Sequence, residues 1–313
     1  MNVKAQFPEE QQDGEFVRQD DAFRGWIKAD GSSEYPVEPG RYQLYVSYAC
    51  PWAHRTIIVR KLKGLEAAIG MTIVDPIRDE RGWRFTFEPD PVNQFTFLSQ
   101  AYEASDAHFD GRVTVPVLWD KKMNRIVSNS DDDIMRMFEV EFNAIAKHPE
   151  LDLYPHQLRP EIDRTNDWIY ETFNNGVYRA GFATRQESYE HAARRVFETL
   201  DELEARLANS RFLFGPHPLE TDWRAFVTLV RFDPVYVGHF KCNLRRIADY
   251  PNLYGYLRDL YQYDGVAETV NFDHIKRHYY ATHDDINPTG IVPIGPLMDL
   301  ESPHGRERLG REN

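Results

Sequence analysis

The chain has 313 residues, of which 42% are hydrophobic and 28% are charged, and its formal net charge is −13. This composition is typical of a globular protein long enough for two domains, each with its own core. The acidic charge argues against duplex DNA or an anionic membrane as a partner. The only two cysteines, Cys50 and Cys242, do not make a disulfide framework, so we expect a reducing, cytoplasmic compartment.

The first predicted elements surround a cysteine. Residues 1–40 are polar and rich in Gly, Pro and acidic residues, which predicts an irregular arm. Alternating apolar residues from Tyr42 to Val46 then predict a half-buried strand. Pro51 suits the first turn of a helix, because its missing N–H costs nothing there. The free N–H groups and the dipole of that helix would face the Cys50 sulfur and favour the thiolate, which is the nucleophilic form.

The third residue after Cys50 determines which thiol chemistry is available. A Cys-x-x-Cys redox pair requires a cysteine at position 53, and Ala53 stands there instead. A mixed disulfide on Cys50 would therefore have to be resolved by a second thiol molecule. The alternative is that Cys50 is only a small buried core residue.

The rest of the first half predicts a thioredoxin-like domain over residues 41–150. Its α/β order is strand, helix, strand, polar excursion, strand, strand and helix. After the first strand and the helix at Cys50, the expected segments are a strand over 71–74, the excursion over 76–111, strands over 113–119 and 125–128, and a helix near 134–138.

The chain changes character near residue 150. Pro149, Pro155 and Pro160 mark a linker. Beyond them, apolar residues recur at helical spacing, which predicts an all-α domain over residues 151–298. Residues 299–313 predict a charged, frayed tail. The helical segments are expected around 162–173, 192–207, 222–232 and 251–262.

Five motifs indicate a family. They are Cys-Pro-Trp-Ala-His-Arg at 50–55, Gly82-Trp83, Thr-Val-Pro-Val-Leu-Trp-Asp at 114–120, Arg-Phe-Asp-Pro-Val-Tyr-Val-Gly-His-Phe-Lys-Cys-Asn at 231–243, and Ile-Asn-Pro-Thr-Gly-Ile-Val-Pro-Ile-Gly-Pro at 286–296. With the predicted domain order, the chain resembles the Xi-class glutathione transferases, the glutathionyl-hydroquinone reductases. The resemblance implies the glutathione transferase fold, a homodimer, glutathione as co-substrate and no metal.

The resemblance also implies a reaction. The Cys50 thiolate takes the glutathionyl sulfur from a glutathionyl-hydroquinone, free hydroquinone leaves, and a second glutathione resolves the mixed disulfide. This agrees with the single-thiol chemistry inferred from Ala53.

By the same resemblance, several residues form the thiol-binding site. Val115 presents its backbone to the cysteinyl part of the ligand, and Pro116 is cis. Trp83 lines the site, or else only anchors its loop. Arg112 pairs with a carboxylate of the tripeptide, or else is an ordinary surface arginine.

The segment 129–133 departs from the family pattern. The family usually carries Asn-Glu-Ser-Ser-Glu here, and its Glu-Ser pair holds the γ-glutamyl group at the start of a helix. This chain has Ser130 and Asp131 in those two positions, so the carboxylate and the hydroxyl are in swapped order. The swap predicts altered glutathione binding or another thiol. A simple N-cap cluster is the alternative and is compatible with ligand binding.

Tyrosines are implied at the acceptor pocket. By resemblance, Tyr178 and either Tyr279 or Tyr280 donate a hydrogen bond to the hydroquinone oxygen. Such a donor stabilises the oxygen as the C–S bond breaks. The alternative for each is a core tyrosine.

Three further residues are expected to be structural. Asp222 matches the last position of the Ser/Thr-x-x-Asp capping box of glutathione transferases, whereas Leu219 does not match the first. We expect His54 to be packed or solvated rather than to stabilise charge at Cys50. Cys242 has no catalytic sequence context.

Two other functions remain open. One is a thiol transferase of the same class that uses γ-glutamylcysteine or mycothiol, which thiol affinities would distinguish. The other is a non-catalytic interaction module, for which Cys50 would titrate like an ordinary thiol.

Overall fold

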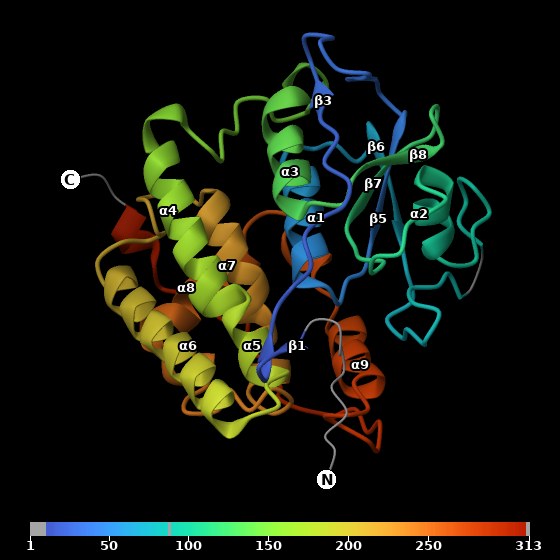
Figure 1. Cartoon of the computed structure of the whole chain (residues 1–313). Helices are drawn as coiled ribbons and strands as arrows, with labels where there is room; N and C mark the ends of the chain where they lie inside the picture. Colours follow the sequence, from blue (N-terminus) through green and yellow to red (C-terminus); the bar gives the residue numbers. More distant parts are fainter. Residues whose placement is uncertain (1–10, 87–88, 311–313) are drawn as a thin grey trace. The chain divides into compact units, whose positions relative to one another are not determined.

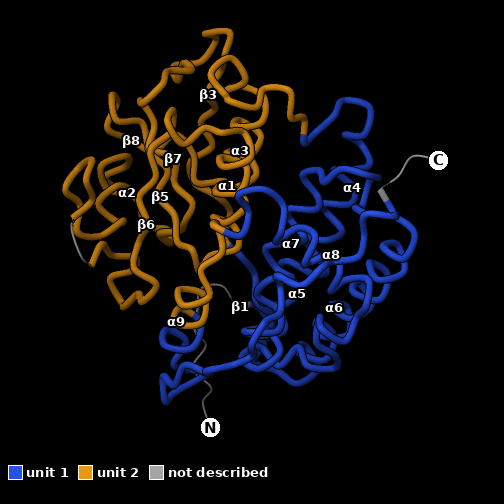
Figure 2. Tube along the Cα trace, turned by 180° about the vertical axis from the view of Figure 1, so that it is seen from behind, with its two compact units in different colours: residues 1–18, 153–267, 279–313 blue, residues 19–152, 268–278 orange. Residues whose placement is uncertain are grey.

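The computed structural model describes residues 11–86 and 89–310, so residues 1–10 of the predicted arm and 311–313 of the predicted tail lie outside it. The chain divides into two compact units (Figure 2). We call residues 19–152 and 268–278 the thioredoxin-like unit, and residues 1–18, 153–267 and 279–313 the helical unit.

A four-stranded sheet forms the centre of the thioredoxin-like unit. Its strands lie in the order β6-β5-β7-β8. β5 runs parallel to β6 and antiparallel to β7, and β7 and β8 form an antiparallel hairpin. The strands are β5 (Tyr42–Val46), β6 (Ile69–Ile73), β7 (Val117–Asp120) and β8 (Arg125–Ser128).

The expectation of a half-buried first strand was wrong, because all five residues of β5 are buried. β5 is an inner strand, paired on both sides, and helices lie on both faces of the sheet. Figure 1 shows α1 (Pro51–Leu62) and α3 (Asp131–Arg136) on one side and α2 (Ser99–Ser105) on the other. A strand covered on both faces has no reason to alternate in polarity.

Other elements of this unit differ in detail from the sequence prediction. α2 lies inside the predicted excursion and was missed, because only Ala101 and Tyr102 among its seven residues are buried. The strand expected from residue 113 begins only at Val117. Pro116 has no N–H for a ladder, and the Thr114 backbone bonds the Tyr102 hydroxyl instead. The helix expected near 134 is α3, which continues into a π-helical turn over Met137–Glu141.

The predicted arm is divided between the two units. It carries the short strands β1 (Gln11–Gln12), β2 (Glu15–Phe16), β3 (Ile27–Lys28) and β4 (Tyr35–Pro36). Gly25 donates its N–H to the Val127 carbonyl over 2.8 Å, which ties this part to β8. Phe16 instead packs on Phe182 of the helical unit, with ring centroids 5.3 Å apart.

Residues 268–278 belong to the thioredoxin-like unit, whereas the sequence analysis placed them in a helical domain over 151–298. Glu268 forms an ion pair with Lys61 at 2.8 Å, and the Thr269 hydroxyl lies 2.8 Å from Nε2 of His54. Both partners are on α1, so long-range contacts determine where this segment packs.

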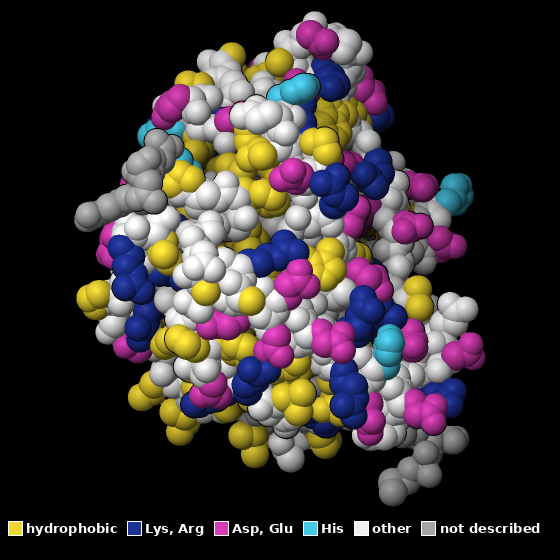
Figure 3. Space-filling view, turned by 90° about the vertical axis from the view of Figure 1, so that its left-hand side faces the viewer, with side chains coloured by type: hydrophobic (Ala, Val, Ile, Leu, Met, Phe, Trp, Pro, Cys, Tyr) yellow, Lys and Arg dark blue, Asp and Glu magenta, His cyan; other side chains and the backbone are white. Residues whose placement is uncertain are grey.

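The helical unit has helices at the four predicted amphipathic segments, and the sequence analysis missed two others, over residues 176–181 and 272–282. The helices pack their apolar residues inward, and Figure 3 shows acidic and basic side chains interspersed on the face in view. Among the described residues, no helix is both long and apolar enough to cross a bilayer. The main helices are α4 (Arg159–Ile169), α5 (Gly176–Gly181), α6 (Gln186–Leu207), α7 (Glu220–Arg231), α8 (Pro251–Tyr261) and α9 (Phe272–Thr282), the last of which begins in the other unit.

Asp222 caps the start of α7 from inside the core. Its Oδ2 accepts from the Leu219 N–H at 2.8 Å, and its Oδ1 accepts from the Leu213 N–H at 2.9 Å and from the Tyr256 hydroxyl at 2.6 Å. Leu219 has no side-chain acceptor, so only one half of a capping box is formed. Burial raises the pKa of Asp222 to about 6, although the hydrogen bonds from Leu213, Tyr256 and Leu219 act to lower it.

We expect Asp222→Asn to destabilise the protein by about 1–3 kcal/mol at pH 7.5. The asparagine amide cannot accept on both sides, so an NH₂ group would face the Leu219 N–H. The pKa of Asp222 is higher in the folded than in the unfolded protein, so the folded protein binds more protons between about pH 4 and 6. The wild type therefore gains stability as the pH falls through 6. The cost of the substitution should therefore grow by about 1.4 kcal/mol per pH unit below 6. Denaturant unfolding at pH 7.5 and 5.5 measures this, and an equal cost at both values would contradict it.

The expectation of a frayed tail was wrong for residues 299–310. Arg306 is only 3% exposed. Its guanidinium donates to the carbonyls of Leu207 at 2.9 Å and Arg211 at 3.0 Å. Leu207 is the last residue of α6, where helix carbonyls lack intrahelical partners. The tail is therefore held in place by the C-terminal end of a helix.

Candidate active site

Cys50 lies at the junction of strand and helix that the sequence predicted. It is the N-cap of α1, Pro51 occupies the first turn, and the Cys50 carbonyl accepts the His54 N–H at 3.0 Å. The Cys50 side chain is half-buried, and its Sγ lies 3.4 Å from the Val115 carbonyl oxygen. The thiol is thus partly accessible, at the positive end of a helix.

The residues around this thiol support a single-cysteine site. Ala53 is fully buried, one turn into α1. The Val115–Pro116 peptide bond is cis. His54 is fully buried and bonded to Thr269, so it is packed, as expected. Cys242 is also fully buried, and burial raises its pKa to about 12, so it is a poor nucleophile at neutral pH.

Trp83 is buried in the loop between β6 and α2. It is 6% exposed, and its indole stacks on the His278 imidazole with ring centroids 4.9 Å apart and planes at 22°. The sequence analysis did not identify His278 as a site residue. The one sequence feature that could have identified it is its position next to Tyr279. The geometry is compatible with both a ligand wall and a loop anchor.

Arg112 is held through its backbone. Its N–H donates to Oε1 of Gln19 at 3.0 Å, and its carbonyl accepts from Nε2 of the same side chain at 2.9 Å. The arm therefore fixes the position of Arg112, three residues before Val115, and the Arg112 side chain remains half-buried.

Ser130 and Asp131 make different contacts at the start of α3. Ser130 is 2% exposed, and its hydroxyl accepts from the Asp133 N–H at 3.5 Å. The Asp131 carboxylate forms an ion pair with Arg55 at 2.9 Å. The Arg55 side chain is 1% exposed and that of Asp131 is 17% exposed. Asp131 is thus fixed by a buried cation on α1, five residues after Cys50.

We expect Asp131→Ser to lower the free energy of unfolding by about 1.5–3 kcal/mol. The substitution leaves a buried guanidinium without the closer of its two carboxylates. Denaturant unfolding measures the loss. Asp132→Ser is the matched control, because Asp132 is 52% exposed and lies 3.6 Å from the same guanidinium. Equal effects of the two substitutions would contradict the assignment.

Three phenols meet in the helical unit. The Tyr178 hydroxyl is hydrogen-bonded to that of Tyr279, and the Tyr236 hydroxyl lies 3.2 Å from that of Tyr279. Tyr178 is 8% exposed, Tyr279 2% and Tyr236 not at all. Burial raises the pKa values of Tyr279 and Tyr236, so both stay protonated hydrogen-bond donors at neutral pH. Tyr236 was missed, although it lies within the motif at 231–243.

Tyr280 does not join these three phenols. Its hydroxyl donates to the Pro234 carbonyl at 3.2 Å, and its ring packs on His239. Of the two tyrosines that the sequence left open, Tyr279 is therefore the one that contacts Tyr178.

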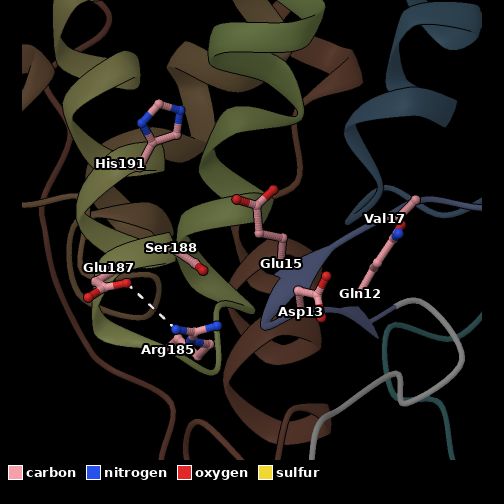
Figure 4. A pocket seen from close by; sticks show the side chains of 8 residues that line it. All are labelled: Gln12, Asp13, Glu15, Val17, Arg185, Glu187, Ser188 and His191. Atoms are coloured by element: carbon pink, nitrogen blue, oxygen red, sulfur yellow. Dashed lines mark ion pairs between the residues drawn. The ribbon is translucent and has the colours of Figure 1, made fainter.

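The helical unit also has an open surface cavity of about 440 Å³ beside the β1–β2 hairpin (Figure 4). It is lined by Glu15, Arg185 and His191 among others, and contains none of the predicted site residues. Within residues 11–86 and 89–310, no group of three or more His, Cys, Asp or Glu side chains is arranged to hold a metal ion.

Comparison with known families agrees with this fold. Residues 49–141 match the glutathione S-transferase N-terminal domain, and residues 186–259 match the glutathione S-transferase C-terminal domain. The first match lies within the thioredoxin-like unit and the second within the helical unit.

Individual relatives place the chain more closely. It is 53% identical to the glutathionyl-hydroquinone reductase YqjG of Escherichia coli over 94% of this chain and 93% of the relative. It is 49% identical to the glutathionyl-hydroquinone reductase PcpF of Sphingobium chlorophenolicum over 92% and 91%. The glutathione-bound structure of YqjG matches with a TM-score of 0.88 over 91% of this chain and 96% of that one. The Xi-class transferase of Natrialba magadii matches with a TM-score of 0.89 over 91% and 89%, at 49% identity. The chain belongs to the Xi-class glutathione transferases.

Proposed function

We propose that this protein is a glutathionyl-hydroquinone reductase. The observation that carries the proposal is the half-buried Cys50 thiol at the start of α1, beside the cis Val115–Pro116 bond and without a second cysteine at position 53. Relatives with that named activity match almost the whole chain.

The proposed reaction has two steps. The Cys50 thiolate attacks the glutathionyl sulfur, an S–S bond forms, and the C–S bond breaks. Its electron pair stays on the ring carbon, which takes up a proton to give hydroquinone. A second glutathione thiolate then attacks the mixed disulfide, releasing glutathione disulfide and the Cys50 thiolate.

We propose roles for the other site residues on the same basis. Val115 and Pro116 receive the cysteinyl part of the thiol, Trp83 covers it, and Arg112 pairs with a ligand carboxylate. Ser130 and Asp131 receive the γ-glutamyl group, with Arg55 holding the Asp131 carboxylate. Tyr178 and Tyr279 face the hydroquinone oxygen: one hydroxyl donates to the other in their shared bond, and the hydroxyl that accepts keeps its own proton for the hydroquinone oxygen.

Turnover tests the proposal directly. Wild-type protein with glutathionyl-hydroquinone and glutathione should release hydroquinone and glutathione disulfide in equal amounts, measured by chromatography. γ-Glutamylcysteine and mycothiol, assayed in place of glutathione, test the choice of thiol. A higher kcat/KM with either would reject glutathione as co-substrate, and no turnover with any thiol would favour an interaction module.

We further propose a homodimer, located in the cytoplasm. Three apolar side chains in the extended segment after α9 are strongly exposed: Ile291 by 70%, Ile294 by 92% and Leu297 by 95%. Apolar side chains gathered on a surface indicate an interaction site. Ile294→Asp with Leu297→Asp should convert a dimer to a monomer in sedimentation velocity, while the surface substitution Lys276→Gln should not. A dimer that persists in the double variant would reject this surface as the interface.

A further inference from the structure

We propose that His278 is a positioning residue of the thiol site, and that its imidazole fixes the orientation of the Trp83 indole against which the thiol ligand binds. This rests on the proposed function. His278 and Trp83 both lie in the thioredoxin-like unit, although α9 continues into the helical unit.

Two contacts determine the orientation of the His278 ring. Its Nδ1 lies 2.8 Å from the Pro76 carbonyl oxygen. A carbonyl oxygen only accepts, so Nδ1 carries the hydrogen and the tautomer is set. The face of the same ring stacks on the indole of Trp83. The imidazole thus connects the start of the loop at Pro76 with the indole.

The loop that carries Trp83 fixes its backbone more firmly than its side chain. The Trp83 carbonyl accepts the Leu98 N–H at 2.9 Å, and neighbouring Arg84 forms an isolated bridge with Phe97. Gly82 before it has φ +90°, a turn conformation that favours glycine. These bonds leave the side-chain torsions of Trp83 to its packing partners. Besides His278, the Arg78 guanidinium lies 5.8 Å from the indole centroid.

The segment that carries His278 is itself anchored on the helix that starts at Cys50. Glu268 pairs with Lys61 and Thr269 with His54, both on α1. Further along, His274 packs edge-on against Tyr48, with ring centroids 5.8 Å apart. These contacts fix the position of His278 relative to α1. The indole of Trp83, which stacks on His278, therefore also keeps a fixed position relative to Cys50.

The test is the binding of S-methylglutathione, an unreactive probe, by isothermal titration. His278→Ala should weaken binding about tenfold and raise the KM for glutathione with little change in kcat. His278→Phe keeps a ring on the indole and should stay within about threefold of the wild type. The matched control is Arg277→Ala, the residue before His278 on α9; its side chain is 44% exposed and pairs with the exposed Asp273, and this variant should bind as the wild type does. Circular dichroism establishes that each variant is folded.

A double-mutant cycle with Trp83→Ala separates positioning from general structure. If His278 acts through the indole, His278→Ala adds nothing to the loss caused by Trp83→Ala. If the two losses multiply, or if His278→Phe binds as weakly as His278→Ala, the proposal is wrong. Should His278→Ala not fold, His278→Phe must bind more tightly than His278→Asn, which keeps a donor for Pro76 but no ring.

The measurements distinguish failure of the positioning role from failure of the proposed function. If the proposed function fails, the wild type neither binds S-methylglutathione nor turns over glutathionyl-hydroquinone. If the wild type does both, and Trp83→Ala loses affinity while His278→Ala keeps it, only the positioning role is rejected.

Discussion

Replacing Cys50 by serine is expected to reduce the turnover of glutathionyl-hydroquinone roughly a thousandfold or more. A serine hydroxyl does not ionise near neutral pH and cannot form the mixed disulfide of the proposed reaction. Release of hydroquinone under saturating glutathione measures the loss. Mass spectrometry of the wild type treated with the substrate alone should show one glutathionyl adduct, on the peptide that contains Cys50.

Cys242→Ala is the control for this experiment. Cys242 is fully buried with a raised pKa, and alanine avoids burying a hydroxyl in its place. Its turnover should remain near that of the wild type. If Cys242→Ala lost as much activity as Cys50→Ser, or if Cys50→Ser retained full turnover, the single-thiol mechanism would have to be abandoned.

The second large effect is expected at the three phenols. Tyr279→Phe removes a buried donor that is bonded to Tyr178 and lies near Tyr236, and it should lower kcat about a hundredfold. Tyr178→Phe should have a similar effect. The double variant should be little worse than either single variant, because the two hydroxyls act through one shared hydrogen bond.

Tyr280→Phe is the matched control, since its hydroxyl donates to the Pro234 carbonyl at 3.2 Å and not to Tyr178 or Tyr279 among the described contacts. It should retain kcat within about threefold. Stopped-flow measurement of hydroquinone release gives these rates. A loss at Tyr280 equal to that at Tyr279 would contradict the assignment of the donor.

Much of the fold was predictable from local sequence. The strand before Cys50, the helix after Pro51, the hairpin of β7 and β8, and the amphipathic helices all depend on periodicity and on proline placement, which act over a few residues. α2 was missed because it is short and little buried. The unit boundaries were only partly predictable. Residues 268–278 pack on α1 and so belong to the thioredoxin-like unit, although the residues before and after them in the chain belong to the helical unit.

The candidate site shows the same division. The sequence by itself determined that Cys50 stands at a helix start without a second cysteine at position 53, since Cys50, Pro51 and Ala53 are close in the chain and their geometry is local. It did not distinguish Tyr279 from Tyr280. Neighbouring residues on a helix point about 100° apart, and only packing decides which one turns toward Tyr178.

Only the tertiary structure decided the partners of the remaining site residues. Asp131 pairs with Arg55 on another helix, and Trp83 stacks on His278 from near the far end of the chain. Such contacts form because burial demands a partner for each charge and a neighbour for each ring. The partner is the residue that the fold brings close in space. The local sequence around Asp131 or Trp83 contains no pattern that identifies it.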